Sequence, residues 1–391
     1  MKKTLIALAL TALPLAAMAE VTIYGTIKGG VEWTQVDGDD YASVINANDW
    51  GSKIGFKGKE TLIPNTVDAI WQVENKVSID SRSGRNDGWA DGETYIGLST
   101  PYGQLRAGHV GDAFDSDDDL NPWDGSGIRV LDDTWSRIGA KHTGIRLDLG
   151  GDAFYGFSAN VLYSMPDNNK ADELFRDNEK VKYSDLPNLA TLPAKAYKEL
   201  LDYDDDNQAP HFVSAGLGYK HAPSGFFGKY AYMRAGGEDP TAEAHRVTVG
   251  YAPDGGNIFV GLGYQATRVN VSTPTQVTAK DYEYEWSSEI AGTASYTIGA
   301  ITPMISVAYG FEFNDIDNSD YIHTILGVDY ALSKRTHAVA NFGWLRTGNA
   351  VDSVLGTVKG NGSGWAPKID DGTTDEDHDA YSVGVGLVHS F

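Results

Sequence analysis

The sequence predicts an all-β protein whose strands close into a transmembrane antiparallel barrel. Three observations support this class. Apolar residues recur at every second position over segments of about ten residues, the alternate positions are small or polar, and the connections alternate between short and long. We count about sixteen such segments. After residue 20 no apolar run approaches the roughly 18 residues that a membrane-spanning helix requires, which excludes a helical bundle.

The alternation is clear from the first segment to the last. In residues 21–31, valine and isoleucine alternate with threonine, tyrosine and lysine. Residues 258–265 and 322–330 repeat the pattern with isoleucine, valine, leucine and tyrosine on one face. The last segment, residues 381–391, sets tyrosine, valine and leucine against serine and glycine and ends on Phe391. Each segment is long enough to be one strand of a membrane barrel.

A soluble sandwich or propeller would also contain many alternating strands, and two features favour a membrane barrel instead. The second face is rich in glycine, serine, threonine, lysine and glutamate, which suits a water-filled lumen better than a packed core. Aromatic residues lie at strand ends, as girdles at the membrane interfaces do. These residues are Tyr230, Tyr232, Tyr251, Trp286, Tyr296, Tyr330 and Trp344.

The connections predict which end of the barrel faces the periplasm. Short turns lie at 221–225, 253–256, 299–300 and 333–335. Long acidic segments lie at 164–210, 266–281 and 347–379. Tight periplasmic turns and long external loops are typical of outer-membrane barrels, so we expect the long segments outside the cell.

The N-terminus predicts a secretory signal peptide over residues 1–19. Lys2 and Lys3 precede the apolar run 5–15, and Ala17-Met18-Ala19 forms a small-x-small cleavage site. We therefore expect the mature protein to be residues 20–391, a single barrel domain.

Composition excludes several functions. The chain has 31 Lys and Arg against 54 Asp and Glu, with no basic block, so nucleic acid is not an expected partner. It has no cysteine, which removes disulfides, thiolate metal sites and a cysteine nucleophile. No G-x-S-x-G motif is present, so we expect neither an enzyme nor a cofactor. The acidic run from Asp115 to Asp119 lacks the glycine and glutamate of a calcium loop, so we expect no dedicated metal site.

Several segments, in order along the chain, resemble the general-diffusion porins of Gram-negative bacteria, in particular the neisserial class. They are VTIYGTIKGG at 21–30, SKIGFKGKE at 52–60, AIWQVENKV at 69–77, GQLRAGHV at 103–110, NPWD at 121–124, SKRTHAVANFGWL at 333–345 and the ending GVGLVHSF.

The resemblance implies a sixteen-stranded antiparallel barrel with an in-folded third loop, assembled as a homotrimer in the bacterial outer membrane among lipid and lipopolysaccharide. It implies a water-filled channel for passive diffusion of ions and small hydrophilic solutes. A substrate-specific porin, or a surface adhesin on the same barrel, is the alternative. Phe391 resembles the signal read by the outer-membrane assembly machinery.

The resemblance also implies a constriction in which an acidic third loop faces a basic wall. The loop falls near 110–135, and its candidate acidic residues are Asp112, Asp115, Asp117, Asp118, Asp119 and Asp124. Strand alternation turns five candidate basic residues toward the lumen, namely Lys28, Lys53, Lys57, Arg137 and Lys141. Arg106 directly precedes the loop, and His109 stands where the family usually has arginine.

Overall fold

The computed structural model describes residues 20–36, 43–79, 89–115, 119–124, 130–131, 141–151, 154–164, 212–236, 241–271, 282–283, 286–312, 318, 320–348 and 378–391. The predicted signal peptide, Asp117, Asp118 and Arg137 lie outside these residues. Among the described residues no helix is long and apolar enough to cross a membrane.

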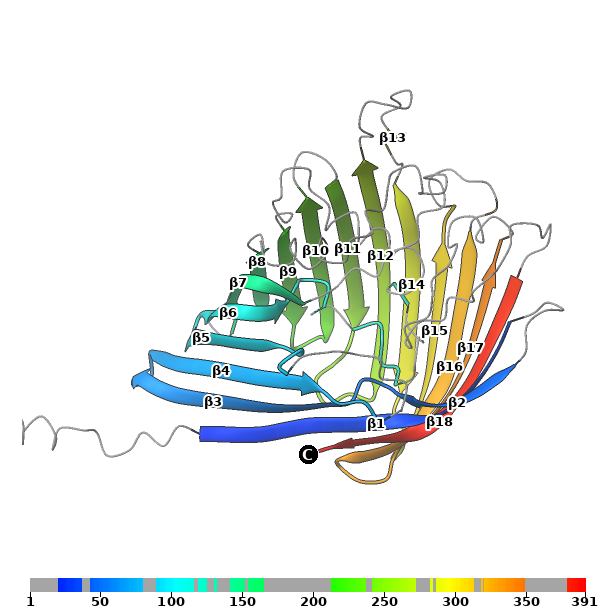
Figure 1. Cartoon of the computed structure of the whole chain (residues 1–391), viewed down its shortest axis with the longest axis horizontal. Helices are drawn as coiled ribbons and strands as arrows, with labels where there is room; N and C mark the ends of the chain where they lie inside the picture. Colours follow the sequence, from blue (N-terminus) through cyan, green and yellow to red (C-terminus); the bar gives the residue numbers. More distant parts are fainter. Residues whose placement is uncertain are drawn as a thin grey trace, which may run out of the picture.

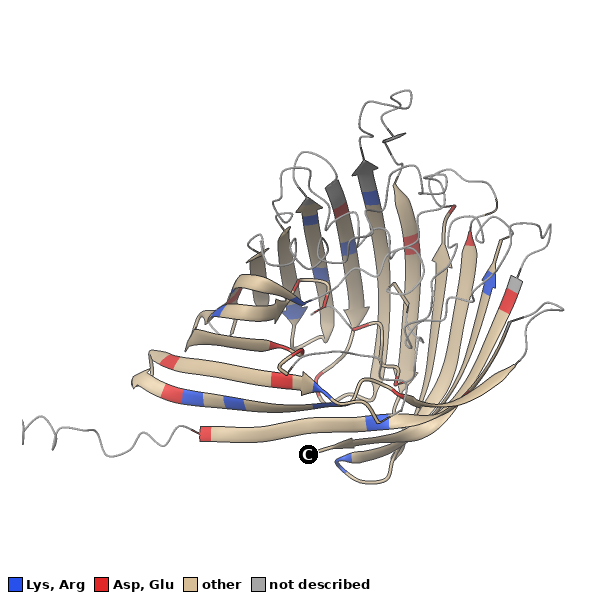
Figure 2. Cartoon of the chain, viewed as in Figure 1, with Lys and Arg blue, Asp and Glu red and all other residues tan. Residues whose placement is uncertain are grey.

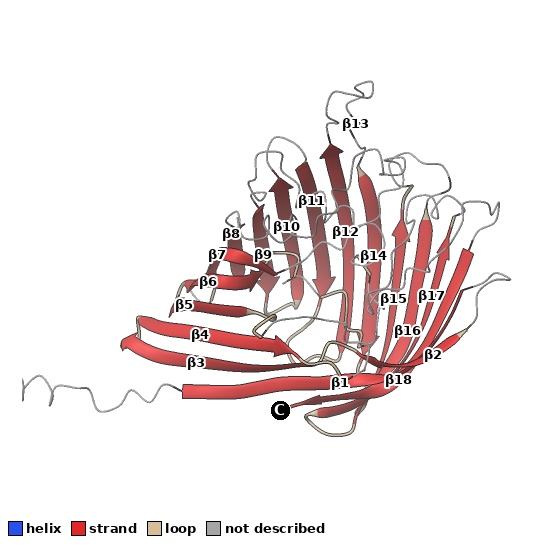
Figure 3. Ribbon diagram, viewed as in Figure 1, coloured by secondary structure: helices blue, strands red, loops and turns tan. Residues whose placement is uncertain are grey.

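The described residues form eighteen β-strands in one antiparallel sheet (Figures 1 and 3). The strands are β1(Glu20–Val36), β2(Val44–Asp49), β3(Lys53–Ile63), β4(Val67–Lys76), β5(Thr94–Thr100), β6(Gly103–Gly111), β7(Lys141–Leu149), β8(Phe157–Ser164), β9(Phe212–His221), β10(Phe226–Gly236), β11(Thr241–Tyr251), β12(Ile258–Val271), β13(Tyr282–Glu283), β14(Ser287–Tyr296), β15(Ile301–Gly310), β16(Tyr321–Ala331), β17(Thr336–Thr347) and β18(His378–Ser390).

The sheet closes into a barrel with sixteen strand positions, as predicted. β1 pairs with β18 on one side, and on its other side with β3 at its start and β2 near its end, so β2 and β3 share one position. The two residues of β13 pair with the end of β12 in the same way, directly beyond β14. The break between β2 and β3 is stabilised by the Ser52 hydroxyl, which donates to the Lys28 carbonyl and accepts from the Lys28 N–H, each at 3.0 Å.

The connections divide between the two ends of the barrel as expected. The hairpins between β9 and β10, β11 and β12, β14 and β15, and β16 and β17 turn within a few residues. The segments after β6, β8 and β17 are long. Both described chain termini lie at the end with the short turns, where the Phe391 N–H donates to the Gly25 carbonyl at 3.1 Å and closes the ring. At the other end, residues 237–240 join β10 to β11. This connection is short, although the alternation of short and long connections predicts a long one there.

The outward face is apolar and exposed, as in Ile23, Leu262 and Val385. A closed barrel satisfies every strand hydrogen bond within the wall, so such a face can meet lipid. The sequence predicts an inward face of small and polar residues. Buried apolar residues such as Leu162 and Ile325 also lie on that face. They lie in two clusters that include residues of the segment between β6 and β7.

Candidate functional site

The segment between β6 and β7, the third loop (residues 112–140), begins with a buried carboxylate. Asp112 Oδ1 accepts hydrogen bonds from the backbone N–H groups of Phe114 and Asp115, each at 2.8 Å. Arg146 of β7 donates to the Asp112 carbonyl at 2.9 Å. Asp112 is fully buried, so it fixes the first turn of the loop and is not a charge exposed to the lumen.

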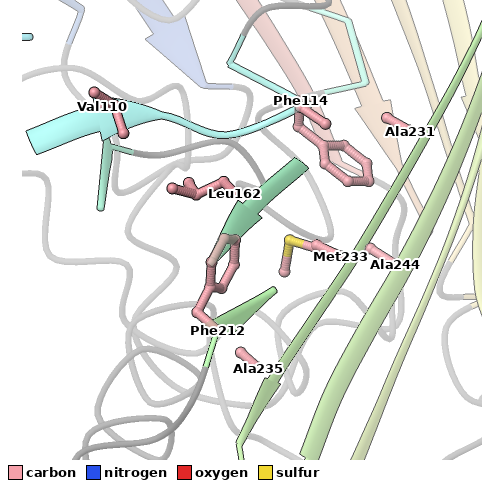
Figure 4. Close-up of a cluster of buried hydrophobic side chains, with 9 residues drawn as sticks. Val110, Phe114, Leu162, Phe212, Ala231, Met233, Ala235 and Ala244 are labelled. Atoms are coloured by element: carbon pink, nitrogen blue, oxygen red, sulfur yellow. The ribbon is translucent and has the colours of Figure 1, made fainter. Parts of the chain in front are cut away.

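An apolar cluster directs the loop inward from β6. Val110, Ala113 and Phe114 pack against the lumenal faces of β8 to β11 (Figure 4). The larger side chains of these strands in the same cluster are Leu162, Phe212 and Met233. Removing these side chains from water anchors the start of the loop inside the barrel, at roughly 1.5–3 kcal/mol for each large side chain.

The far part of the loop is bonded to strands across the lumen. The Leu131 N–H donates to Glu289 Oε1 on β14 at 2.8 Å, and its carbonyl accepts from Arg246 Nη2 on β11 at 2.8 Å. Trp123 Nε1 donates to Ser306 Oγ on β15 at 2.8 Å. The loop therefore crosses the lumen to the opposite wall, which confirms the predicted in-folded third loop.

Two glycines make room for the loop on that wall. A side chain at Gly263 of β12 would collide with Leu120 and Leu131, and one at Gly327 of β16 would collide with Trp123. Small residues at these lumenal positions therefore let the loop lie directly on the strands.

Three of the loop's acidic residues pair with lysines on different strands. Asp124 Oδ1 lies 2.8 Å from Lys28 Nζ on β1, and Asp119 Oδ2 lies 2.6 Å from Lys229 Nζ on β10. Asp115 Oδ1 lies 3.6 Å from Lys141 Nζ on β7. All six side chains remain partly exposed, so these pairs border water. The pairs of Asp119 and Asp124 hold the loop electrostatically at two points on the lumenal wall. Lys141 pairs with Gly111 and shares a face with the exposed Ile145 and Leu147, so the register does not support the expectation that Lys141 faces the lumen.

The wall formed by β3 and β4 carries several lysines, and Figure 2 shows basic positions along β3. None of these lysines forms a salt bridge with a described residue of the third loop. Lys53 Nζ lies 3.0 Å from Glu74 Oε2, which also accepts from the Tyr24 hydroxyl at 3.1 Å. Lys57 Nζ lies 5.2 Å from the centre of the Tyr24 ring, and no acidic residue of the described chain pairs with it. Lys76 faces the lumen directly opposite Lys53. Positive charge therefore accumulates on this wall.

Arg106 is held in a network rather than standing in open water. Its Nη1 lies 2.7 Å from Glu93 Oε1 and its Nη2 lies 2.7 Å from Asp148 Oδ2. Its guanidinium also stacks on the Tyr95 ring, and the side chain is only 12% exposed. Asp148 bonds Arg146 as well, so this network supports the strand next to the start of the loop.

The strand register turns His109 away from the lumen. His109 pairs with Thr94 and Thr143 and therefore shares a face with the exposed Leu105 and Ile145. Arg106 lies on the opposite, lumenal face of the same strand. The expectation that His109 lines the pore is not supported by this register.

Charged residues that position the loop or its surroundings but were not predicted from the sequence include Glu74, Arg146, Lys229, Arg246 and Glu289. Alternation alone turns each of them inward, because each lies an even number of residues from other lumenal residues of its strand. Their partners on the loop could not be read from the sequence.

Comparison with known proteins gives one family and several related chains. A family model described as Gram-negative porin matches residues 4–350. The major outer membrane protein P.IB of Neisseria meningitidis serogroup B is 33% identical over 378 residues, covering 93% of this chain and 98% of that protein.

Two solved structures have the same fold. An anion-selective porin from Comamonas acidovorans superposes with a TM-score of 0.62 at 16% identity, covering 95% of this chain and all of that one. The in-vitro folded OmpT of Vibrio cholerae in its trimer form gives a TM-score of 0.56 at 13% identity, covering 95% of this chain and 99% of that one.

Proposed function

The chain belongs to the Gram-negative porin family and forms an outer-membrane diffusion channel, and on this premise we propose that its constriction lies where the third loop crosses the lumen. Ions and small hydrophilic solutes pass between the loop and the β3–β4 wall. The observation that carries the proposal is the path of the loop, which leaves β6 and is bonded to β11, β14 and β15.

The paired charges and the wall lysines have different roles in this proposal. The pairs of Asp119 and Asp124 with lysines keep the loop in place and largely cancel each other's fields. Lys53, Lys57 and Lys76 lie near the passing ion and favour anions locally. Because the lumen is narrow and the groups lie on its surface, close charges select ions more strongly than charges on distant loops.

Planar bilayer recording tests this function directly. The purified protein should form stepwise, ohmic channels whose reversal potential in a salt gradient moves toward the cation value when Lys53 is changed to glutamate. An exposed lysine at the periplasmic turn, Lys334, provides the matched control, and Lys334→Glu should change the reversal potential little. A protein that forms no channels would contradict the function, and channels with unchanged selectivity in Lys53→Glu would contradict the role of the wall.

The assembled protein is a homotrimer in this proposal, in keeping with the trimer form named for one of the similar structures. Each closed barrel resists detergent because no strand edge is left unpaired. An unheated gel band at about three times the barrel mass that falls to one barrel mass after heating would support the trimer. A single barrel mass in mild detergent would count against it.

We assign residues 1–19 to a cleaved signal peptide and Phe391 to recognition by the assembly machinery. Phe391 supports this because it ends the closing strand and its ring covers Gly25 of β1 on the outer face. Phe391→Asp should lower the amount of folded protein in the outer membrane, while channels that do form keep their conductance. If Phe391→Asp reached the same amount in the outer membrane as the wild type, Phe391 would not be the assembly signal.

A further inference from the structure

Two phenylalanine rings lie on the lumenal wall, on the periplasmic side of the third loop. Phe227 is the second residue of β10 and Phe259 is the second residue of β12, and both strands begin at the end with the short turns (Figure 1). Phe227 shares a face with the lumenal Lys229, and Phe259 shares a face with Gly261, on which the loop residue Leu120 lies. The two rings therefore face the lumen between the loop and the periplasmic mouth.

The rings form one aromatic surface across three strands. Their centres are 6.1 Å apart and their planes differ by 25°, as in an offset-stacked pair. β11 lies between β10 and β12 and contributes Gly250, where a side chain would collide with the Phe227 ring. The glycine thus lets the Phe227 ring extend across β11 toward Phe259.

The packing of the third loop explains only one of these rings. Phe259 packs against the apolar cluster that includes Leu120 and Trp123. Phe227 belongs to neither apolar cluster of the described residues, and both rings stay partly exposed. The lumen of such a barrel is typically polar, so an open aromatic surface there is unusual. It offers a face on which a planar apolar group of a passing solute can stack.

A pair of opposite charges borders this aromatic surface at the mouth. Lys220 of β9 is the direct cross-strand neighbour of Phe227 on the lumenal face. Lys220 Nζ lies 2.6 Å from Asp254 Oδ1, in the turn between β11 and β12. The two side chains are 47% and 64% exposed, and an ion pair this exposed contributes little stability, so both groups can exchange partners.

The charges and the rings together match a solute with one ring and two opposite charges. A carboxylate on the solute can accept from Lys220, and an ammonium group can donate to Asp254, while a ring on the same short arm stacks on Phe227. A solute with a single charge would pair with only one of the two groups. The complementary solute is therefore zwitterionic and aromatic.

We propose that Phe227 and Phe259, with Lys220 and Asp254, form a binding site for aromatic amino acids at the periplasmic mouth. The site rests on the proposed diffusion function, since it acts on solutes that have passed the constriction. It holds these solutes on the β10–β12 wall and leaves the passage of ions along the β3–β4 wall unchanged.

Saturation-transfer NMR with the purified, folded protein and L-phenylalanine measures the affinity of the site. The half-saturating concentration should rise about fivefold in Phe227→Ala, because the stacking surface is lost. Phe226→Ala is the matched control, since Phe226 is the preceding residue on the lipid-facing side and is 62% exposed, and it should bind as the wild type does. Equal affinity for L-phenylalanine in the wild type and Phe227→Ala would overturn the proposal.

Two charge variants test the two ends of the zwitterion separately. 3-Phenylpropionate keeps only the carboxylate of the solute, and phenethylamine keeps only the ammonium group. Lys220→Gln should weaken the binding of L-phenylalanine and 3-phenylpropionate about threefold, with phenethylamine bound no more weakly. Asp254→Asn should weaken the binding of L-phenylalanine and phenethylamine, with 3-phenylpropionate bound no more weakly. Tighter binding of either singly charged solute than of L-phenylalanine by the wild type would overturn the choice of a zwitterion.

Single-channel conductance in potassium chloride separates the site from the channel function. All four variants should form channels with the conductance of the wild type. Normal channels without binding of L-phenylalanine in the wild type would overturn the site alone, whereas a wild type that forms no channels would contradict the diffusion function.

Discussion

Two walls of the lumen carry lysines in opposite situations. On β1 and β10, Lys28 and Lys229 each pair with an aspartate of the third loop. On β3, Lys57 lies over the Tyr24 ring and pairs with no acidic residue of the described chain. In the proposed function the same residue type therefore has two roles: the paired lysines fix the width of the passage, and the wall lysines act on the ions within it.

The largest effect should follow from releasing the loop. Trp123→Ala removes a buried indole and its bond to Ser306, at a cost of about 3 kcal/mol. The loop should then leave the far wall part of the time, giving a larger and noisier single-channel conductance. Trp344→Ala is the matched control, because Trp344 bonds Asp379 on the outward face. Equal conductance traces in the wild type and Trp123→Ala would show that the loop does not set the width.

Reversing a wall charge should have a smaller effect, which is confined to ion selectivity. Reversing one charge ~10 Å from an ion changes the energy of that ion by about 0.6 kcal/mol in water at 0.01 M salt, with opposite signs for a cation and an anion. Lys57→Glu should therefore shift the cation-to-anion permeability ratio by about eightfold at this salt concentration. At 1 M salt, where the Debye length is about 3 Å, the shift should nearly vanish. Reversal potentials in salt gradients measure both values.

The same reversal on the loop-contacting wall sharpens the comparison. Lys229→Glu places a second carboxylate against Asp119, so it should change conductance as well as selectivity. Lys57→Glu should change selectivity alone. If both variants gave the same pattern, the division between the two walls would be wrong.

The smallest effect is expected at His109. Because its register turns it outward, protonation of its imidazole should not reach the lumenal ions. His109→Ala should leave the reversal potential unchanged, and titration from about pH 8 to about pH 5.5 should give the same curve in the variant and the wild type. If the wild type showed a pH-dependent reversal potential that was absent in His109→Ala, His109 would line the passage and this prediction would be wrong.

The sequence predicted the barrel well because a strand's two faces follow from residue parity alone. Lys28 and Lys57 could be turned toward the lumen in this way. His109 was placed by family position instead, although the alternation from Leu105 would have turned it outward. Parity along one strand thus carried more information than analogy at that residue.

The partners of the loop could not be predicted, because they depend on the closed ring. Asp124 and Lys28 are 96 residues apart, and Trp123 and Ser306 are 183 apart. The burial of Asp112 likewise depends on its neighbours on β7, Arg146 and His142. Alternation predicts only that a side chain faces the lumen. Whether that side chain contacts water or the third loop depends on the path of the loop.

The most direct test of the account is a charge-swap cycle between Lys28 and Asp124, read by single-channel conductance. Lys28→Asp and Asp124→Lys each place like charges together, so each single variant should release the loop and raise the conductance and its noise. The double variant restores an opposite pair and should return both to wild-type values. If the double variant behaved as the sum of the two single variants, the loop would not be held across the lumen by this pair, and the account would be contradicted.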